Sequence, residues 1–498
     1  MVKIMTHRSD PYILTLDLGS SSTRALLFDR HGQAVDSIEA RIPYELQSGS
    51  DGSSIDDPDQ AVARAVACID LIVAEVARRQ WQIAAVAVDT LAATFIVLDG
   101  AGKPLTPLIS YADTRNASDA EQLQASYAEA EVHQRTGCLL RTSYWPARLA
   151  WLRRSEPAIW RQAKRFVSLG EYVEQALFGS GRAAISPASW TGMLDRRRNT
   201  WDTELCAALE VDLAQLGQIC DTSEPRSDLR PSYASRWPLL RGVPWFAALG
   251  DGAAANLGSG CVGPGRVALT VGTTGALRVV REQVEQVPAG LWCYRVDRRR
   301  ALLGGATSEG GNVYAWLRRT LQLDPPEQLE AALAALPAAS HGVQVLPFWA
   351  GERSPGWAGD ARASIVGLQM ATTPTEIVRA CFEGVAYRFG LIAEQLLRAD
   401  PHATVVVSGG GLLQSAAWTQ IVADVLGREL HCSEEREATA RGCGLIALEA
   451  LGLIANLDEL PARIGRVVHP NMENHARYRE QIEHQQHLYR HLIAPPQP

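Results

Sequence analysis

Apolar and polar residues alternate along residues 12–45, and two short polar turns interrupt the alternation at residues 19–22 and 29–32. Alternation with a period of two is typical of β-strands that bury one face. The pattern therefore predicts three antiparallel strands joined by tight turns near the start of the chain.

A helix is predicted directly after these strands. Asp57 is a suitable N-cap and Pro58 suits the first helical position. The apolar residues that follow share one helical face: Val62, Val66, Ile69, Val73 and Val76. The run IAAVAVD at residues 83–89 then resembles a short buried strand. Strands that alternate with amphipathic helices indicate an α/β protein.

A second strand–turn–strand pattern begins at residue 266. Its turn, Gly272-Thr273-Thr274-Gly275, matches the first turn, Gly19-Ser20-Ser21-Ser22, and Thr270 takes the place of Asp17. A chain of 498 residues is too long for a single hydrophobic core, so we interpret the match as an internal duplication. The predicted domains are residues 12–251 and 252–490. Chance similarity between two hairpins rich in small residues is the alternative.

A third glycine-rich turn, Gly409-Gly410-Gly411, joins a predicted strand to a predicted helix. Turns of small residues present backbone N–H groups that bind phosphate, although no G-x-x-x-x-G-K-[ST] motif is present. We expect the three turns and their neighbours to bind the phosphates of a nucleotide: Asp17, Gly19, Ser20, Ser21, Ser22, Thr23, Gly272, Thr273, Thr274, Gly409, Gly410, Gly411 and Ser415.

Asp17 is an acid within an otherwise apolar strand. A buried carboxylate is costly without a partner. Beside amides that bind phosphate, it is suited to hold Mg²⁺ through water, because Mg²⁺ keeps several waters and takes few protein ligands. Arg24 is a candidate for neutralising phosphate charge, and its alternative is an ordinary solvated strand residue.

Composition excludes several classes of function. A net charge of −7 argues against nucleic acid as a partner, since that would need a basic surface. Nine dispersed cysteines are typical of reduced thiols in a cytoplasmic protein. No apolar run approaches 18 residues, which argues against a membrane span. The first residues lack the apolar core of a signal peptide.

These motifs, in this order, resemble the FGGY family of carbohydrate kinases, within the superfamily of actin, hexokinase and chaperone ATPases. The similar segments are LDLGSSSTR, YWPARLAWLRRSEP, TVGTTGAL, ASIVGLQMATTPTEIVRACFEG, VVVSGGGLLQSAAWTQIVADVLG and EATARGCGLIALEALG. Arg148 stands in the second of these where Lys is usual. The resemblance implies two duplicated ribonuclease H-like domains with a cleft between them, and ATP with Mg²⁺ as cofactors.

Asp251 is the predicted catalytic residue. It follows a predicted strand, Trp245 to Leu249, and stands between two glycines at the start of a helix of small residues. Open α/β sheets bind ligands at the carboxyl ends of strands, and a helix N-terminus favours an ionised carboxylate. The resemblance implies that Asp251 is the general base that accepts the proton of a sugar hydroxyl. A helix-capping role is the alternative.

Residues 89–116 resemble the sugar-facing segment of the family and are most similar to the gluconokinase branch, with xylulokinases next. The implied reaction is phosphorylation of D-gluconate to 6-phosphogluconate, or of a pentulose or other polyol. Expected substrate contacts are Ala92, Ala93, Asp113, Arg115, Tyr144 and Asp251. Ala92-Ala93 departs from the Met-His, Trp-His or similar pair that is usual there in gluconokinases and xylulokinases, and so removes a polar sugar contact. Arg115 is suited to bind a substrate carboxylate or to pair with Asp113.

Two functions of other classes remain open from the sequence. A chaperone-like ATP-binding clamp would need the phosphate turns but not Asp251, and a sugar-binding regulator would not need Asp17. Because the chain retains both sets of residues, a kinase is the economical interpretation. ATP and a sugar or sugar acid are the expected partners, with a homodimer left open as the assembly.

Overall fold

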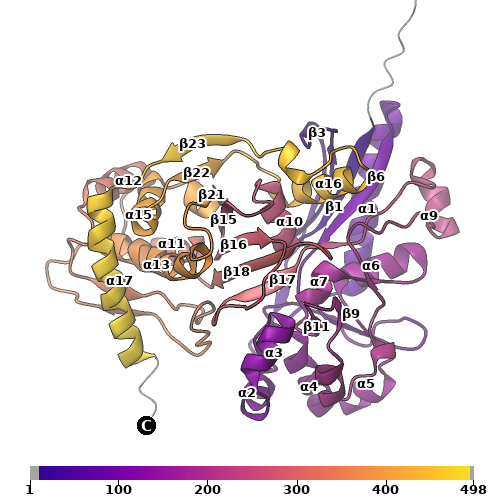
Figure 1. Ribbon diagram of the computed structural model, residues 1–498, viewed down its shortest axis with the longest axis horizontal. Coiled ribbons are helices and arrows are strands. Elements are labelled where there is room, and N and C mark those ends of the chain that lie inside the picture. Colours follow the sequence, from indigo (N-terminus) through magenta and orange to yellow (C-terminus); the bar gives the residue numbers. More distant parts are fainter. Residues whose placement is uncertain (1–10, 494–498) are drawn as a thin grey trace, which may run out of the picture.

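The computed structural model describes residues 11–493, which form two halves, each built on a central sheet (Figure 1). The first sheet has the strand order β14–β6–β1–β2–β3 and the second β17–β18–β16–β15–β21–β22–β23. The first sheet comprises β1 (Tyr12–Leu18), β2 (Ser22–Phe28), β3 (Ala34–Pro43), β6 (Ile83–Thr90) and β14 (Leu249–Gly250). The second comprises β15 (Arg266–Val271), β16 (Gly275–Arg281), β17 (Trp292–Arg295), β18 (Ala301–Thr307), β21 (Thr404–Ser408), β22 (Leu430–Ser433) and β23 (Ile464–Val468).

The two sheets repeat one topology. In the first, β1, β2 and β3 are antiparallel, and β6 and β14 continue the sheet in parallel with β1. In the second, β15, β16 and β18 are antiparallel, and β21 and β22 continue in parallel. This repetition confirms the predicted fold class, an α/β protein of two duplicated ribonuclease H-like domains. The exact boundary between residues 251 and 252 stays a prediction.

Helix α1 (Pro58–Arg78) begins as predicted. The Asp57 side chain accepts hydrogen bonds from the backbone N–H groups of Asp59 at 2.8 Å and Gln60 at 3.2 Å. This cap satisfies donors that have no partner within the helix. The buried face of α1 includes Ile69, Val73 and Val76. The other main helices are α6 (Leu169–Phe178), α10 (Asp251–Gly258), α11 (Gly311–Thr320), α12 (Pro326–Ala335), α13 (Pro374–Leu397), α15 (Ala416–Leu426), α16 (Ala438–Ala450) and α17 (Met472–Leu492).

Helices α10 and α16 join the two halves and lie between the two sheets (Figure 1). Their backbones approach so closely that each needs a glycine. A Cβ on Gly258 would lie 1.7 Å from the Ala438 carbonyl oxygen, and one on Gly442 would lie 1.9 Å from the Ala254 carbonyl oxygen. Since α16 also packs on β1 and β6, the second half covers one face of the first sheet.

Residues between β6 and β14 form a lobe beside the first sheet, with its own hydrophobic cluster around Phe95, Trp145 and Phe166. Its helices are α2 (Ala117–Ser126), α3 (Glu129–Thr136), α4 (Trp145–Ser155), α5 (Pro157–Gln162), α7 (Ile185–Ser189), α8 (Thr203–Ala208) and α9 (Pro231–Arg236). Short strands of the lobe include β7 (Ile96–Leu98), β9 (Arg165–Val167), β11 (Leu194–Asp195) and β12 (Thr200–Trp201).

One predicted element is shorter than expected. The strand predicted from Trp245 to Leu249 is wrong in its extent, because only Leu249 and Gly250 form β14. Trp245 makes single bridges to Val86 and to Arg226 on its two sides, so the segment runs beside β6 without forming a regular ladder.

Among residues 11–493 no helix combines the length and hydropathy that a membrane crossing needs. All nine cysteines are free and buried.

Candidate active site

A cavity of about 260 Å³ lies between the two halves, and Asp251 is part of its wall. The first half contributes Ser20, Ala92 and Tyr144, and the second half contributes Thr274 and Arg278. The size suits one small ligand. The cleft between duplicated domains that the sequence predicts is therefore present, and it holds groups from both halves.

Asp251 begins α10, with Gly250 as the N-cap. Its Oδ1 accepts a hydrogen bond from the Gly252 N–H at 2.7 Å, and its side chain does not cap the helix. Burial raises the pKa of Asp251 to about 6, while the Gly252 N–H and the charge of Arg278 hold it down. A carboxylate with this pKa is ionised at neutral pH and still basic enough to accept a proton.

Trp190 explains both glycines beside Asp251. A Cβ on Gly250 would lie 2.9 Å from the indole Nε1, and one on Gly252 would lie 2.8 Å from the indole ring. Trp190 stacks on Tyr294 at a centroid distance of 3.8 Å, and Tyr294 stacks on Trp292 at 4.4 Å. These three rings form an aromatic wall of the cavity. The glycines thus let the wall pack directly against the backbone of the predicted base.

Two arginines from the second half also line the cavity, Arg278 on β16 and Arg353. Burial lowers the pKa of Arg278 to about 10, while the charge of Asp251 raises it. The buried Arg278 Nε has no hydrogen-bond acceptor among the residues that the structure describes. Within residues 11–493 neither guanidinium forms an ion pair with a carboxylate. Two cationic groups in the cavity are therefore available to a ligand.

Asp17 lies at the carboxyl end of β1, next to Asp89 on the neighbouring strand β6. Both are buried, with 2% of Asp17 and none of Asp89 exposed. Arg24 donates to Asp17 Oδ2 from Nε at 3.0 Å and to Glu437 from Nη1 at 2.6 Å. Burial and the charges of Asp17 and Asp251 raise the pKa of Asp89 well above its usual range. Arg24 is therefore an ion-pair partner of Asp17, not a solvated strand residue.

The donor set fits the expected magnesium. Mg²⁺ needs only one or two carboxylates besides waters and phosphate oxygens. Asp89 Oδ1 is buried and has no partner among the described residues, and Asp17 lies beside the exposed turn of Ser20 and Ser21. Within residues 11–493 no group of three or more His, Cys, Asp and Glu side chains is arranged as a metal-ligand cluster. Asp17, with Asp89 beside it, is the pair that would hold the ion.

The predicted phosphate turns lie where the sequence places them. Ser20 and Ser21 are exposed between β1 and β2, and Thr273 and Thr274 are exposed between β15 and β16. The carbonyl oxygen of Gly19 accepts a hydrogen bond from the Tyr44 hydroxyl at 2.5 Å, which anchors the start of the first turn. Ser22 and Thr23 are already buried in β2. Both turn tips are therefore open to a ligand in the cleft.

The third glycine turn meets the second one. Gly409 has a φ of +92°, and a Cβ on it would lie 2.5 Å from the Val271 carbonyl oxygen. A Cβ on Gly411 would lie 2.6 Å from the Gly272 carbonyl oxygen. Gly410 begins a short helix, α14 (Gly410–Leu413). Ser415 accepts a hydrogen bond from the Trp418 N–H at 3.0 Å and so caps α15.

Gly310 and Gly311 complete this arrangement and were missed by the sequence analysis. The Gly311 N–H donates to the Gly272 carbonyl at 2.7 Å, and the Asn312 N–H donates to the Thr273 carbonyl at 3.2 Å. A Cβ on Gly310 would lie 2.8 Å from the Thr274 carbonyl. The glycine pair in EGGNVYAW was the available signal. Three glycine segments thus pack backbone against backbone beside the predicted phosphate turn, and glycine at each position permits this close approach.

The expected substrate residues separate into two groups. Ala92, Ala93 and Tyr144 line the cavity with Asp251. Asp113 and Arg115 are not among its lining residues. Arg115 donates to Asp113 Oδ2 at 2.7 Å and lies over the Trp151 ring, so it forms the local ion pair that the sequence left as its alternative role.

Arg148 does not line the cavity but supports the turn that does. It is fully buried and donates to the carbonyl oxygens of Ala93 at 2.5 Å and Ser110 at 2.6 Å. Ala93 has a φ of +53°, in the left-handed region. Burial lowers the pKa of Arg148 to about 9. The side chain therefore holds the strained turn that carries Ala92 and Ala93.

Family models for carbohydrate kinases match most of the chain. The N-terminal domain of the FGGY family of carbohydrate kinases matches residues 12–258, and the C-terminal domain of that family matches residues 267–451. The chain belongs to this family. The family prediction is confirmed, and the protein is a phosphotransferase that acts on a carbohydrate, as its relatives are.

Individual relatives agree on the fold and differ in substrate. A gluconokinase from Bacillus subtilis is 27% identical, with 91% of this chain and 90% of that protein covered. A glycerol kinase from Dechloromonas aromatica is 30% identical, with 94% and 95% covered. The crystal structure of a gluconate kinase from Lactobacillus acidophilus has a TM-score of 0.90 at 25% identity, covering 98% of this chain and 99% of that chain. A xylulose kinase from the same organism has a TM-score of 0.91 at 26% identity, covering 97% and 99%.

Proposed function

We propose that the protein phosphorylates a hydroxyl of a sugar acid with ATP, and that D-gluconate is its substrate. The observation that carries this proposal is the pair of guanidinium groups, Arg278 and Arg353, in the wall of the Asp251 cavity. Guanidinium groups bind carboxylates through paired hydrogen bonds. The similarity to gluconokinases points in the same direction.

The substrate's carboxylate would lie between the two arginines, and its hydroxyls would face the small residues Ala92 and Ala93 and the Tyr144 hydroxyl. The aromatic wall of Trp190, Trp292 and Tyr294 would cover its carbon-bound hydrogens. The Tyr144 and Tyr294 hydroxyls are 2.6 Å apart, which fixes the rings on both sides of the cavity. Ala92 and Ala93 offer no polar side chain to the substrate. The polar contacts that they lack would come from the second half of the protein.

Asp251 would accept the proton of the attacking hydroxyl. Its carboxylate is ionised at neutral pH and is fixed by the Gly252 N–H. The turns at 19–22 and 272–275 and the glycine segments beside the second turn would orient the phosphates of ATP, since positioning and charge neutralisation dominate phosphoryl transfer. When bound beside Asp17, Mg²⁺ supplies positive charge that offsets the charge on the transferred phosphoryl group.

The test compares two substrates of nearly equal shape in the parent and in one variant. ADP release would be measured with D-gluconate and with D-glucitol, its neutral counterpart, for the parent and for Arg278→Met. Truncating one partner of a hydrogen-bonded charge pair costs about 2 kcal/mol or more, so kcat/KM for gluconate should fall roughly 30-fold or more. At pH 9, where Asp251 is ionised in both proteins, the rate with glucitol should change much less.

A neutral polyol is the second candidate, favoured by the identity to glycerol kinase. It predicts equal or faster turnover of glycerol, D-xylulose or D-glucitol than of gluconate. It also predicts that Arg278→Met affects all substrates alike. Either result would replace the sugar acid as the substrate while leaving the kinase assignment intact.

A further inference from the structure

A second cavity, of about 710 Å³, lies between two hairpin turns that have the same sequence. The turn from β11 to β12 contains Asp195-Arg196-Arg197-Arg198, and the turn from β17 to β18 contains Asp297-Arg298-Arg299-Arg300. The first turn belongs to the lobe of the first half and the second turn to the second half. The cavity therefore spans both halves, and none of its lining residues lines the Asp251 cavity.

Both turns use their aspartate in the same way. Asp195 Oδ1 accepts from the backbone N–H groups of Arg197 at 2.9 Å and Arg198 at 3.1 Å. Asp297 Oδ1 accepts from those of Arg299 at 2.8 Å and Arg300 at 2.6 Å. These bonds close the turns. The aspartates thereby build the backbone that projects the arginine side chains.

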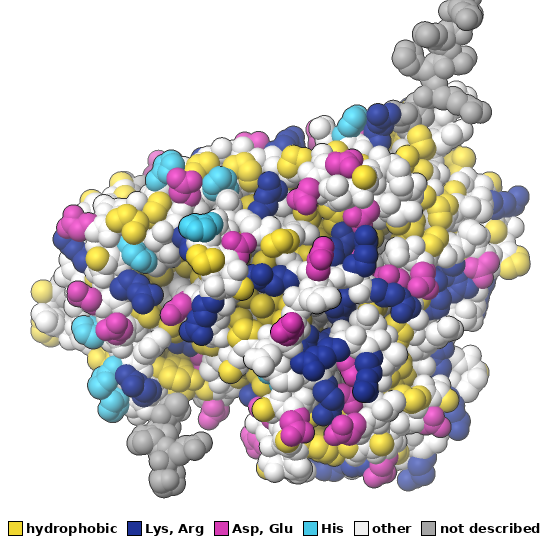
Figure 2. Space-filling view, viewed as in Figure 1, with side chains coloured by type: hydrophobic (Ala, Val, Ile, Leu, Met, Phe, Trp, Pro, Cys, Tyr) yellow, Lys and Arg dark blue, Asp and Glu magenta, His cyan; other side chains and the backbone are white. Residues whose placement is uncertain are grey.

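Arginines outnumber acids five to two in the cavity wall. The arginines are Arg196, Arg197, Arg295, Arg298 and Arg299, and the acids are Glu282 and Glu285. Figure 2 shows Lys and Arg side chains gathered on this face near the place of β11 in Figure 1. The whole chain, in contrast, has a net charge of −7. A local excess of arginine on a protein of negative net charge is typical of a surface that attracts anions.

Two of these arginines are buried and form no ion pair with a carboxylate among residues 11–493. Arg196 is 3% exposed and Arg295 is 8% exposed. Arg196 donates to the backbone carbonyls of Gln134, Val284 and Glu285, and Arg295 donates to those of Asp297 and Arg298. Burial lowers the pKa of both guanidinium groups.

Arg197 also lacks a carboxylate partner and donates to the Glu285 carbonyl at 2.7 Å. In the described part of the chain, no acid forms an ion pair with Arg196, Arg197 or Arg295. Arg298 lies 3.4 Å from Glu224, and Arg299 lies 3.2 Å from Glu449. The guanidinium groups of Arg196, Arg197 and Arg295 thus make their hydrogen bonds to backbone carbonyls, and carboxylates act on Arg196 and Arg295 only through charge, without an ion pair.

Buried charges without an opposite charge are costly. Planar oxygen groups that bind bidentately are the ligands that guanidinium groups favour. We propose that this arginine cavity is a second ligand site, which binds a small anion carrying two or more phosphate or carboxylate groups and so holds the two halves together.

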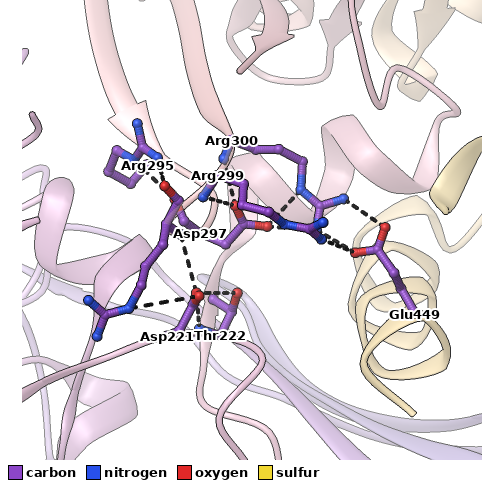
Figure 3. Close-up of polar contacts among 8 residues, drawn as sticks. Asp221, Thr222, Arg295, Asp297, Arg299, Arg300 and Glu449 are labelled. Carbon is purple, nitrogen blue, oxygen red and sulfur yellow. Dashed lines mark hydrogen bonds and ion pairs between the residues drawn. The ribbon is translucent and has the colours of Figure 1, made fainter. Parts of the chain in front are cut away.

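The cavity is connected to the active site by two strands and a helix. Arg295 follows Tyr294 on β17, and Tyr294 lines the Asp251 cavity. Glu282 directly follows β16, which carries Arg278. Figure 3 shows Arg299 and Arg300 pointing toward Glu449 on α16, and the Arg300–Glu449 contact measures 2.6 Å. An anion in the arginine cavity should therefore change the KM for the sugar.

The test is a calorimetric titration of the full chain with sodium pyrophosphate in Mg²⁺-free buffer. Saturating ADP fills the phosphate turns. The parent is compared with Arg197→Glu/Arg298→Glu and with the control Arg319→Glu, an exposed arginine on α11. Pyrophosphate should bind the parent and the control alike, and its Kd should rise at least tenfold in the double variant.

Citrate and orthophosphate serve as further probes. Tighter binding of pyrophosphate than of citrate identifies phosphate groups as the ligand chemistry, and the reverse identifies carboxylates. Orthophosphate should bind much more weakly than either, because it offers a single group. If the double variant melts early, Arg197→Gln/Arg298→Gln replaces it in the same comparison.

Kinetics provide an independent readout. At saturating ATP, pyrophosphate should shift the KM for the sugar at least twofold in the parent and leave that of the double variant unchanged. The proposal is overturned if no probe binds the parent, or if parent and double variant bind all probes equally. It is also overturned if the double variant changes only the mass of the particle in solution, which would make the arginines a contact between copies of this chain.

Discussion

Asp251 should set the acid limb of the pH–rate profile. Its pKa lies at about 6 because burial disfavours the charged form, and a general base works only when it is ionised. The value of kcat/KM should be half-maximal near pH 6 and reach its plateau near pH 7.5. At pH 5 it should be about a tenth of the plateau, since one pH unit below the pKa leaves roughly a tenth of the base ionised.

Arg278→Met should move this limb to higher pH. The positive charge of Arg278 stabilises the ionised form of Asp251, so its removal raises the pKa of Asp251. At an effective dielectric constant of about 20, two charges several ångströms apart interact by roughly 1–3 kcal/mol. That corresponds to about 1–2 pKa units. At pH 7 the ionised fraction would fall from about nine-tenths to one-half or less.

The assay is ADP release at subsaturating sugar between pH 5 and 9, for the parent, Arg278→Met and Arg319→Met. Asp251→Asn should lose roughly 10²–10⁴-fold in turnover. It should melt no lower than the parent at pH 7, because a carboxyl whose folded-state pKa is raised loses stability as the pH rises above its unfolded pKa. An acid limb that moves by less than about 0.3 pH units in Arg278→Met would refute the coupling. Turnover of Asp251→Asn within about threefold of the parent would refute the base.

Three further predictions concern the metal, the helix pair and domain movement. Asp17→Ala should raise the Mg²⁺ concentration needed for half-maximal rate and leave sugar affinity, measured calorimetrically, nearly unchanged; a collapse of sugar affinity would misplace Asp17. Gly442→Ala should lower the free energy of unfolding in urea by about 2–3 kcal/mol, because its Cβ would lie 1.9 Å from the Ala254 carbonyl. The control is Gly444→Ala on the same helix, where the Cβ would have its nearest neighbours at 3.6 Å. Equal urea midpoints for the two variants would contradict the close approach. Sugar with a non-hydrolysable ATP analogue should reduce the radius of gyration in solution scattering, and ATP hydrolysis without sugar should be slow. An unchanged scattering profile or brisk hydrolysis without sugar would count against closure of the two halves over the substrates.

Local patterns were predictable from the sequence because they depend on neighbouring residues. The Asp57 cap and the two hairpins follow from residue order alone, whereas Asp251 was predicted as the base from its place between two glycines together with the family resemblance. The role of those glycines was not predictable. It depends on Trp190, which lies 60 or more positions away in the sequence and packs on both of them.

The polar groups of the cavity were harder to predict for the same reason. Arg278 lies between apolar residues on β16 and resembles an ordinary strand residue, and only the folded chain shows that it lines the cavity. Asp89 resembles the end of a strand, and only the parallel pairing with β1 brings it beside Asp17. Arg115 seemed suited to a carboxylate, but the structure places Asp113 within 2.7 Å of it. Contacts that form only in the folded protein decide these roles, and the order of residues alone does not specify them.

Internal competition tests the central claim most directly. The protein would receive limiting ATP with D-gluconate, D-xylulose and glycerol at equal concentrations, and the phosphorylated products would be separated and counted. The product ratio equals the ratio of kcat/KM values. A site that pairs a carboxylate with Arg278 and Arg353 predicts that phosphogluconate exceeds the other products by at least about 100-fold. Product that is mostly phosphorylated xylulose or glycerol would contradict a sugar-acid site in this cavity.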